Sequence, residues 1–178
     1  MASICVYCSS SEQIDPSYLE LADAVGTELA ARGHSLVSGG GRVSMMGRLA
    51  RAARAGGAHT TGVIPQHLVP YEVADVDADE LVVVDTMRER KRVMDDRSDA
   101  FLALPGGLGT FEELFEVWTS ASLDMHKKPV VVLDPAGHYA PLWAYLESLR
   151  DSGFVRQTAL DQLVRVADVA SAFAALDR

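Results

Sequence analysis

Short apolar runs rich in β-branched residues alternate along the chain with longer stretches of mixed polarity. The short runs predict seven strands, Ile4–Cys8, His34–Val37, Thr60–Ile64, Leu81–Val84, Ala100–Leu104, Val130–Leu133 and Leu163–Val166. Several of these runs are apolar at every position, which is typical of strands that are covered on both faces in a parallel sheet.

The stretches between the runs predict amphipathic helices, because their apolar residues recur every three or four positions. One stripe comprises Tyr18, Leu21, Ala22, Val25 and Leu29, and another comprises Phe111, Leu114, Phe115 and Trp118. Asp15-Pro16 supplies a cap and first turn for the first helix, and Gly33 ends it. Alternating strands and helices predict one α/β domain over residues 1–178, with a doubly wound, mostly parallel sheet of about seven strands and helices on both faces.

Composition narrows the class of protein. The chain has 178 residues, of which 48% are hydrophobic and 23% charged, so a folded core is expected rather than disorder. The net charge of −9 disfavours nucleic-acid polymers and anionic membranes as partners. No apolar run approaches the roughly 18 residues of a membrane helix, and no basic segment precedes the first apolar run, so we expect a cytoplasmic protein.

Cys5 and Cys8 form a CxxC pair. A redox pair of this type belongs at a helix start, whereas these two cysteines fall on a strand that points them to opposite faces. Two cysteines also cannot complete a zinc site. We therefore interpret them as packed thiols.

Candidate chemistry lies just after the strands, because ligands of doubly wound sheets bind at the carboxyl ends of the strands. Ser9–Ser11 follow the first strand and either line a crevice or turn the chain. Three glycines, Gly39–Gly41, follow the second strand and allow a close backbone approach. A dinucleotide fingerprint would need glycine where Ser44 stands and an acidic residue directly after the strand, so a Rossmann oxidoreductase is disfavoured.

The strongest local signal is Pro-Gly-Gly-Leu-Gly-Thr-Phe-Glu-Glu at residues 105–113. A glycine-rich turn that opens a helix presents backbone N–H groups and the positive end of the helix dipole, which together bind phosphate. No Lys-Ser/Thr pair follows, so this is not a Walker loop. Thr110 and Glu113 also have capping-box spacing, and Glu113 therefore has a structural alternative.

A second signal is Thr-Met-Arg-Glu-Arg-Lys at residues 86–91. Thr86 and Glu89 fit a capping box. Arg90 and Lys91 share a helix face with Met87 and Met94. These two cations either form an anion site or remain solvated at a rim, bonded to Asp95 or Asp96.

Taken together, these motifs resemble the LONELY GUY (LOG) family of cytokinin riboside 5′-monophosphate phosphoribohydrolases, whose members have often been labelled "possible lysine decarboxylase". Residues 105–113 match the family's PGGxGTxxE pattern, and residues 87–91 match its MxxRK pattern. The resemblance extends from Val6 to about Pro135. Ser9 and Ser44 depart from it, because the family usually has glycine near both positions.

The resemblance implies a homodimeric, Rossmann-like enzyme that cleaves the N-glycosidic bond of an adenosine-type 5′-monophosphate, needs no metal or organic cofactor, and releases ribose 5-phosphate with adenine or an N6-prenylated adenine. Arg90 and Glu113 would be the catalytic pair. The implied nucleotide-binding residues are Gly40, Glu72, Met87, Arg90, Lys91, Gly106, Gly107, Leu108, Gly109, Thr110, Phe111, Glu112, Glu113 and Thr119. Small residues in Met45–Ala55 point to the dimer, and the tail after Pro135, with Trp143 and Leu146, is expected to pack or form an interface.

These residue types suit the reaction. Loss of the base builds positive charge on the ribose, and the Glu113 carboxylate can stabilise that charge and position water. Arginine scarcely releases its proton, so Arg90 would orient and stabilise rather than act as an acid.

Two other functions remain open at this stage. Decarboxylation with pyridoxal phosphate would need a lysine for a Schiff base, and Lys91 lies beside an arginine while Lys127 and Lys128 lie in a polar turn. The same fold could also bind a nucleotide without turning it over.

Overall fold

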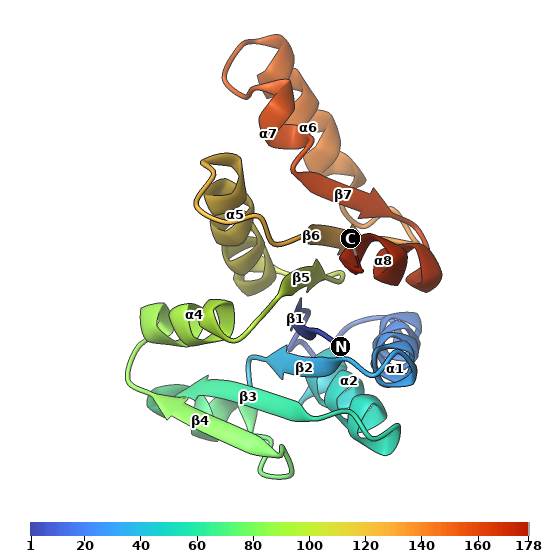
Figure 1. Ribbon diagram of the computed structural model, residues 1–178, viewed down its shortest axis with the longest axis vertical. Helices are drawn as coiled ribbons and strands as arrows, with labels where there is room; N and C mark the ends of the chain where they lie inside the picture. The colour runs from blue at the N-terminus through green and yellow to red at the C-terminus, as the bar shows by residue number, and fades with distance from the viewer. Residues whose placement is uncertain (178) are drawn as a thin grey trace.

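A parallel sheet forms the centre of the molecule (Figure 1). The computed structural model describes residues 1–177, apart from the side chains of Tyr71 and Glu72. In this part of the chain the sheet has seven strands in the order β4-β3-β2-β1-β5-β6-β7, and every neighbouring pair is parallel. The strands are β1 (Ser3–Tyr7), β2 (Ser35–Ser38), β3 (Thr60–Pro65), β4 (Glu80–Val84), β5 (Ala100–Ala103), β6 (Val130–Leu133) and β7 (Leu163–Val166). The seven predicted strands are confirmed, with ends that differ by one residue at most.

All helices except the last, α8, connect successive strands. They are α1 (Pro16–Ala31), α2 (Ser44–Ala55), the short 3₁₀ turn η1 (Gln66–Leu68), α3 (Val69–Glu72), α4 (Met87–Asp96), α5 (Leu108–Ser122), α6 (Ala140–Asp151), α7 (Gln157–Leu160) and α8 (Val169–Leu176). The Asp15 carboxylate accepts the Ser17 N–H at the start of α1, and Gly33 follows the end of this helix with a φ of +71°. Both predicted boundaries of this helix are therefore confirmed.

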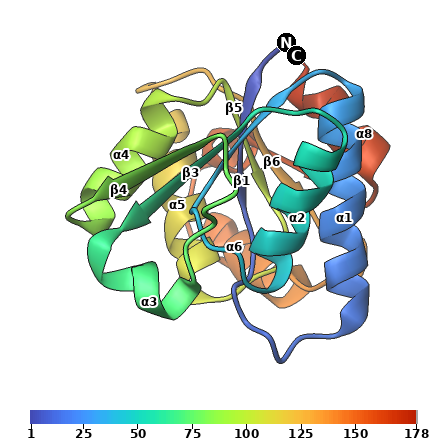
Figure 2. The same cartoon turned by 90° about the horizontal axis from the view of Figure 1, so that it is seen from below.

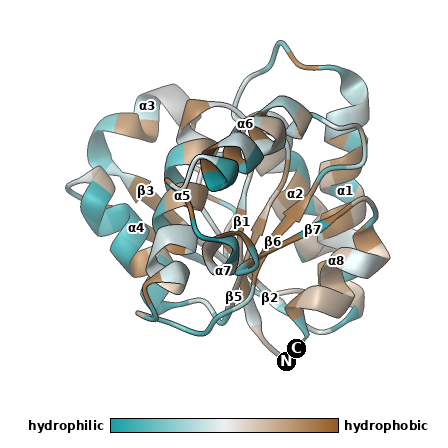
Figure 3. Ribbon diagram, turned by 90° about the horizontal axis from the view of Figure 1, so that it is seen from above, coloured by the Kyte–Doolittle hydropathy of each residue, from teal (hydrophilic) through white to brown (hydrophobic). Residues whose placement is uncertain are grey.

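Figure 2 shows helices on both faces of the sheet, and a hydrophobic core lies beneath the helices of each face. Ile4 and Val6 of β1 face the core under α1, α2 and α8, whereas Cys5 and Tyr7 face the core under α4, α5 and α6. Figure 3 shows the strands as predominantly hydrophobic and much of α4 as hydrophilic. The doubly wound arrangement follows from these strands, which are apolar on both faces.

The small residues of α2 serve the packing of one helix against its neighbour. A Cβ on Gly26 of α1 would lie 2.5 Å from the Leu49 carbonyl oxygen and 2.8 Å from the Ala52 Cβ. Close approach of the two backbones therefore needs small residues in both helices. Gly47, Ala50 and Ala53 of α2 are buried within the chain, so these small residues of Met45–Ala55 serve the packing of the chain itself.

The order of the strands reverses beside β1, because the chain moves outward through β2, β3 and β4 and then returns to β5 on the other side. At such a point the connections diverge and leave a crevice at the carboxyl ends of the strands. The two ends of the chain lie together on the other side of the molecule, at the amino ends of the strands (Figure 2). Ala2 and Asp177 both contact His34 there.

Candidate active site

A cavity of about 250 Å³ lies at the carboxyl ends of β1, β2 and β5. Its position is the crevice beside β1 where doubly wound sheets bind ligands. Residues from six segments of the chain line it, namely Val6–Ser11, Gly39, Met46, Leu68, Met87 with Arg90, and Gly107–Thr110 with Glu113. The structure thus brings together both glycine-rich turns and both members of the expected catalytic pair.

The N-terminus of α5 opens into this cavity. Gly107 is the N-cap, and it has no side chain with which to cap the helix. Leu108, Gly109 and Thr110 form the first turn, where helix geometry gives the N–H groups no carbonyl partner within the helix. These N–H groups and the helix dipole produce a positive site suited to a phosphate group.

The capping-box alternative for Glu113 is wrong. Thr110 lies inside the helix rather than at the N-cap, and it is buried. Its side chain packs on Gly106, where a Cβ would lie 2.1 Å from the Thr110 Oγ1. Glu113 therefore has no capping role, and its half-buried side chain lines the cavity instead.

Arg90 is held in the wall of the cavity. Its side chain is only 4% exposed, Nε donates to the Val63 carbonyl at 3.1 Å, and Nη2 donates to the Gly39 carbonyl at 2.8 Å. A Cβ on Gly39 would lie 1.9 Å from Nη2, so the glycine makes room for the guanidinium group. The solvated-rim interpretation is therefore wrong for Arg90.

Lys91, the next residue, lies outside the cavity lining. Its ammonium group forms ion pairs with Glu112 and Glu116 of α5. Burial lowers the pKa of Lys91, but these two carboxylates outweigh burial and raise it, so the amine stays protonated. The expected partners Asp95 and Asp96 pair with Lys128 and Arg92 instead.

The start of α4 has the predicted cap. The Thr86 hydroxyl accepts the Glu89 N–H at 3.1 Å, and the Glu89 carboxylate accepts the Asp85 N–H at 3.1 Å. The reciprocal bond is thus displaced by one residue from that of an ideal capping box. Glu89 has a structural role, as predicted.

Tyr7 and Cys8 add neutral groups to the cavity. Burial is the main cause that raises the pKa of Tyr7 well above its ordinary value, and that of the Cys8 thiol as well. Burial also raises the pKa of Cys5 to about 12. The raised pKa values favour the protonated forms of these groups. Cys5 is buried in the core, as expected of a packed thiol, whereas Cys8 is half-buried and lines the cavity.

Some of the predicted binding residues lie elsewhere. Gly40 does not line the cavity. Its φ of +73° is a conformation that glycine adopts readily, so the turn needs a glycine at this position. Phe111 packs against Tyr139, and Thr119 lines a separate apolar groove of α5 with Phe115 and Trp118. Glu72 ends α3, and its side chain lies outside the described residues.

Gly39 lines the cavity, as a member of the glycine turn that the sequence places after the second strand. The sequence did not single out Met46, Leu68 or Tyr7 as lining residues. Tyr7 could have been found from the rule that ligands bind at strand ends. Met46 and Leu68 carry no local signal, because their helices reach the cavity only through the tertiary fold.

Ser44, one of the two departures from the family pattern, has a φ of +49°. Glycine adopts this conformation without strain, which explains the usual residue at this position. The Ser44 hydroxyl donates to the Ser11 carbonyl at 2.5 Å and so holds the loop after β1. Ser9 lines the cavity, as an added side chain at this position was expected to do.

The described residues contain no group of three His, Cys, Asp or Glu side chains that could hold a metal ion. None of their helices is both long enough and apolar enough to cross a membrane.

A doubly wound parallel sheet with a glycine-rich helix start at its switch point defines a Rossmann-like α/β protein. Solved structures agree on this fold. The molybdenum cofactor carrier protein of Chlamydomonas reinhardtii superposes with a TM-score of 0.74 at 24% identity, over 98% of this chain and 95% of that one. The molybdenum cofactor binding protein of Rippkaea orientalis gives 0.72 at 24% identity, over 97% and 93%.

Sequence comparisons go further. Residues 46–176 match the family model described as "Possible lysine decarboxylase". Cytokinin riboside 5′-monophosphate phosphoribohydrolase from Mycobacterium marinum is 55% identical over 92% of this chain and 87% of the relative, and that from Mycobacterium tuberculosis is 53% identical over 97% and 92%. The chain belongs to the LONELY GUY family, as its motifs predicted.

Proposed function

We propose that this protein hydrolyses the N-glycosidic bond of adenosine-type 5′-monophosphates, cytokinin riboside 5′-monophosphates among them, and releases ribose 5-phosphate and the free base. The single observation that carries the proposal is the cavity that joins the start of α5, Arg90 and Glu113. The names of the relatives support the same reaction, because each describes a phosphoribohydrolase.

The phosphate binds the N–H groups at the start of α5, and this fixes the far end of the substrate. The apolar side chains of Met46, Leu68 and Met87 lie in the same cavity and offer a surface for the base. The ribose then lies between these two ends, so that binding energy at the phosphate holds C1′ in register with the reacting groups.

Glu113 and Arg90 act on the reacting bond. Positive charge develops on the ribose as the base leaves, and the Glu113 carboxylate stabilises it and orients the attacking water. Arg90 remains a cation, and its bonds to two carbonyl groups fix its plane in the wall, where it orients the substrate and Glu113.

Decarboxylation with pyridoxal phosphate is not supported. A Schiff base needs an unprotonated lysine amine at the site, whereas Lys91 pairs with two carboxylates outside the cavity lining. Lys127 and Lys128 form ion pairs with Asp124 and Asp95. In our proposal Lys91, Glu112 and Glu116 hold α4 against α5, and so keep Arg90 opposite Glu113.

We also propose that the enzyme works as a homodimer. The groove beside α5 is bordered by two exposed apolar side chains, Leu123 at 66% and Phe154 at 82% exposure. Exposed apolar groups that cluster in this way are typical of protein interfaces.

The direct test is release of base. The purified protein is incubated with adenosine monophosphate and with its N6-isopentenyl analogue, and the free base is followed by chromatography. We expect release from at least one substrate, and a loss of at least about 100-fold in kcat for Glu113→Gln and for Arg90→Met.

Glu147→Gln is the matched control, because Glu147 is an exposed glutamate of α6 that lies outside the cavity lining. It should keep kcat within about threefold and retain the thermal unfolding midpoint. If the unsubstituted protein bound both nucleotides but released no base, it would be a binding module. If Glu113→Gln kept full activity, the proposed role of Glu113 would be wrong.

A further inference from the structure

The loop between β6 and α6 contacts the glycine-rich turn of residues 104–107, which precedes α5. In this loop, the Asp134 carboxylate accepts the backbone N–H groups of His138 and Tyr139, each at 2.8 Å. The loop is therefore held in a fixed shape, and it presents two neighbouring side chains to the turn.

Tyr139 binds the turn from within the core. Its side chain is only 1% exposed, and its hydroxyl donates to the Leu104 carbonyl at 2.6 Å. Burial and then the Asp134 charge raise the pKa of Tyr139, while a hydrogen bond with the backbone of Gly106 opposes them. The neutral phenol thus holds the backbone immediately before Pro105.

His138 binds the same turn from the surface. Its Nε2 lies 2.9 Å from the Gly106 carbonyl oxygen, and it must carry a hydrogen because a carbonyl oxygen can only accept. The chain has no cis peptide bond among its described residues, so the carbonyl of Gly106 and the N–H of Gly107 point in opposite directions. The bond from His138 therefore fixes the direction of the Gly107 N–H at the N-cap of α5.

We propose that His138 and Tyr139 are positioning residues that hold the phosphate-binding turn in its binding conformation before substrate arrives. The turn contains two successive glycines, which sample many backbone conformations when unrestrained. Restraint before binding lowers the entropic cost of ordering the turn around the phosphate. This inference rests on the proposed function, since it assigns the phosphate of the substrate to this turn.

The test measures binding of ribose 5-phosphate, the product that carries the phosphate, by titration calorimetry. His138→Ala should raise the Kd about fivefold, as expected for one lost hydrogen bond, and Tyr139→Phe should raise it by a similar factor or more. His138→Gln retains a donor near the Nε2 position and should restore the Kd to within about twofold.

Two controls remove the same groups elsewhere. His59→Ala removes an exposed histidine before β3, and Tyr145→Phe removes the hydroxyl of an exposed tyrosine of α6. Both should leave the Kd unchanged. Thermal unfolding of every variant separates loss of binding from loss of folding.

The outcomes are distinguishable. Weaker binding by His138→Ala, rescue by His138→Gln and equal unfolding midpoints for these two variants would support the inference. If the unsubstituted protein binds ribose 5-phosphate and His138→Ala binds it equally well, the inference is wrong. If the unsubstituted protein does not bind ribose 5-phosphate at all, the proposed function itself fails.

Discussion

Gly39 and Arg90 form a matched pair at the residue scale, because the guanidinium group occupies the space that a side chain at residue 39 would need. We expect Gly39→Ala to displace Arg90 and to lower kcat by about 10- to 100-fold, since small displacements of catalytic groups are costly. The unfolding midpoint should fall by only a few degrees. Steady-state kinetics and thermal unfolding check both expectations.

A double-mutant cycle tests the cause of this effect. Arg90→Met removes the Nη2 atom with which a Cβ at residue 39 would clash. Adding Gly39→Ala to Arg90→Met should therefore lower kcat by no more than about twofold. Equal losses in both backgrounds would show that Gly39 acts independently of Arg90.

The buried thiols make stability depend on alkaline pH. Because the folded state raises the pKa of Cys5 from 9.0 to about 12, its contribution to stability is present below pH 9 and is lost as the pH rises towards 12. In this window the unfolding free energy of the unsubstituted protein decreases as the pH rises. In Cys5→Ala this decrease should be smaller, by up to about 1.4 kcal/mol per pH unit. Urea unfolding of the unsubstituted protein and of Cys5→Ala at pH 8 and pH 10 gives the change of the unfolding free energy with pH for each. Equal changes in the two proteins would contradict Cys5 as the cause.

Adjacent residues of the same charge show where prediction from sequence ends. Spacing placed Arg90 and Lys91 on one face of α4, yet Arg90 lies in the cavity wall and Lys91 pairs with α5. In the same way, Glu112 pairs with Lys91 outside the cavity, whereas Glu113 lines it. A motif identifies the segment, but only the packing of α4 against α5 decides which neighbour faces the cavity.

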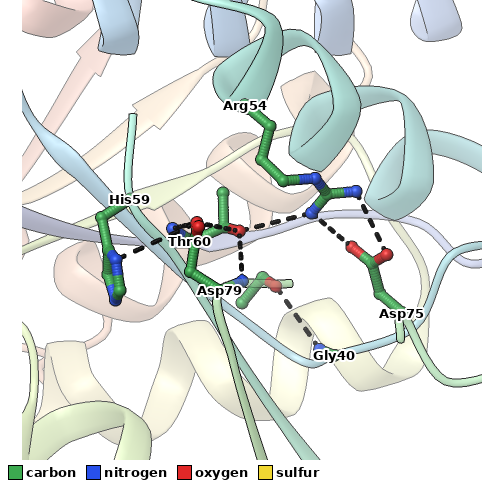
Figure 4. A network of polar contacts seen from close by, with 7 residues as sticks. Gly40, Arg54, His59, Thr60, Asp75 and Asp79 are labelled. Carbon is green, nitrogen blue, oxygen red and sulfur yellow. Dashed lines mark hydrogen bonds and ion pairs between the residues drawn. The ribbon is translucent and has the colours of Figure 1, made fainter. Parts of the chain in front are cut away.

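At the scale of elements, one polar network joins α2 to the chain before β4 (Figure 4). Arg54 of α2 makes two hydrogen bonds to the buried Asp75, at 2.8 and 3.1 Å. The Asp75 N–H donates to the Gly40 carbonyl at 2.8 Å. Thr60 of β3 joins Arg54 to Asp79, and the network thereby ties the Gly39–Gly41 turn to α2, to β3 and to the segment before β4.

Loss of Arg54 should therefore be costly. Arg54→Met leaves the Asp75 carboxylate buried without its cation, and we expect the unfolding free energy to fall by about 3 kcal/mol. Arg48→Met removes a more exposed pair with Asp23 on the same helix and should cost less than about 1 kcal/mol. Urea unfolding of the two variants checks the difference, and equal losses would contradict it.

Elements were the most predictable level of the structure. Each predicted strand is present because an apolar run of four or five residues between helical stretches is too short for a helix of its own. The short η1 and α3 turns were not predicted. They carry no periodic pattern, although they bring Leu68 to the cavity.

At the scale of the whole molecule, the cavity exists because the strand order reverses beside β1. The sequence predicted a parallel sheet and a site at the carboxyl ends of strands, but local patterns do not specify which strands are neighbours. Met46, Leu68 and Glu113 are far apart in sequence and meet only through this order.

The proposed dimer is tested at the same scale. The 19.1 kDa chain should elute with twice that mass in size-exclusion chromatography with light scattering. Phe154→Asp places a charge beside the groove of α5 and should shift the mass towards that of one chain. A single-chain mass for the unsubstituted protein would contradict the dimer.

The meeting of both chain ends at His34 has a practical consequence. An affinity tag or fluorescent fusion at either end emerges at the pole opposite the cavity, so the enzyme can be immobilised with its substrate entrance unobstructed. A short peptide could also link the two ends, and the chain could be reopened in an exposed loop to give a circular permutant.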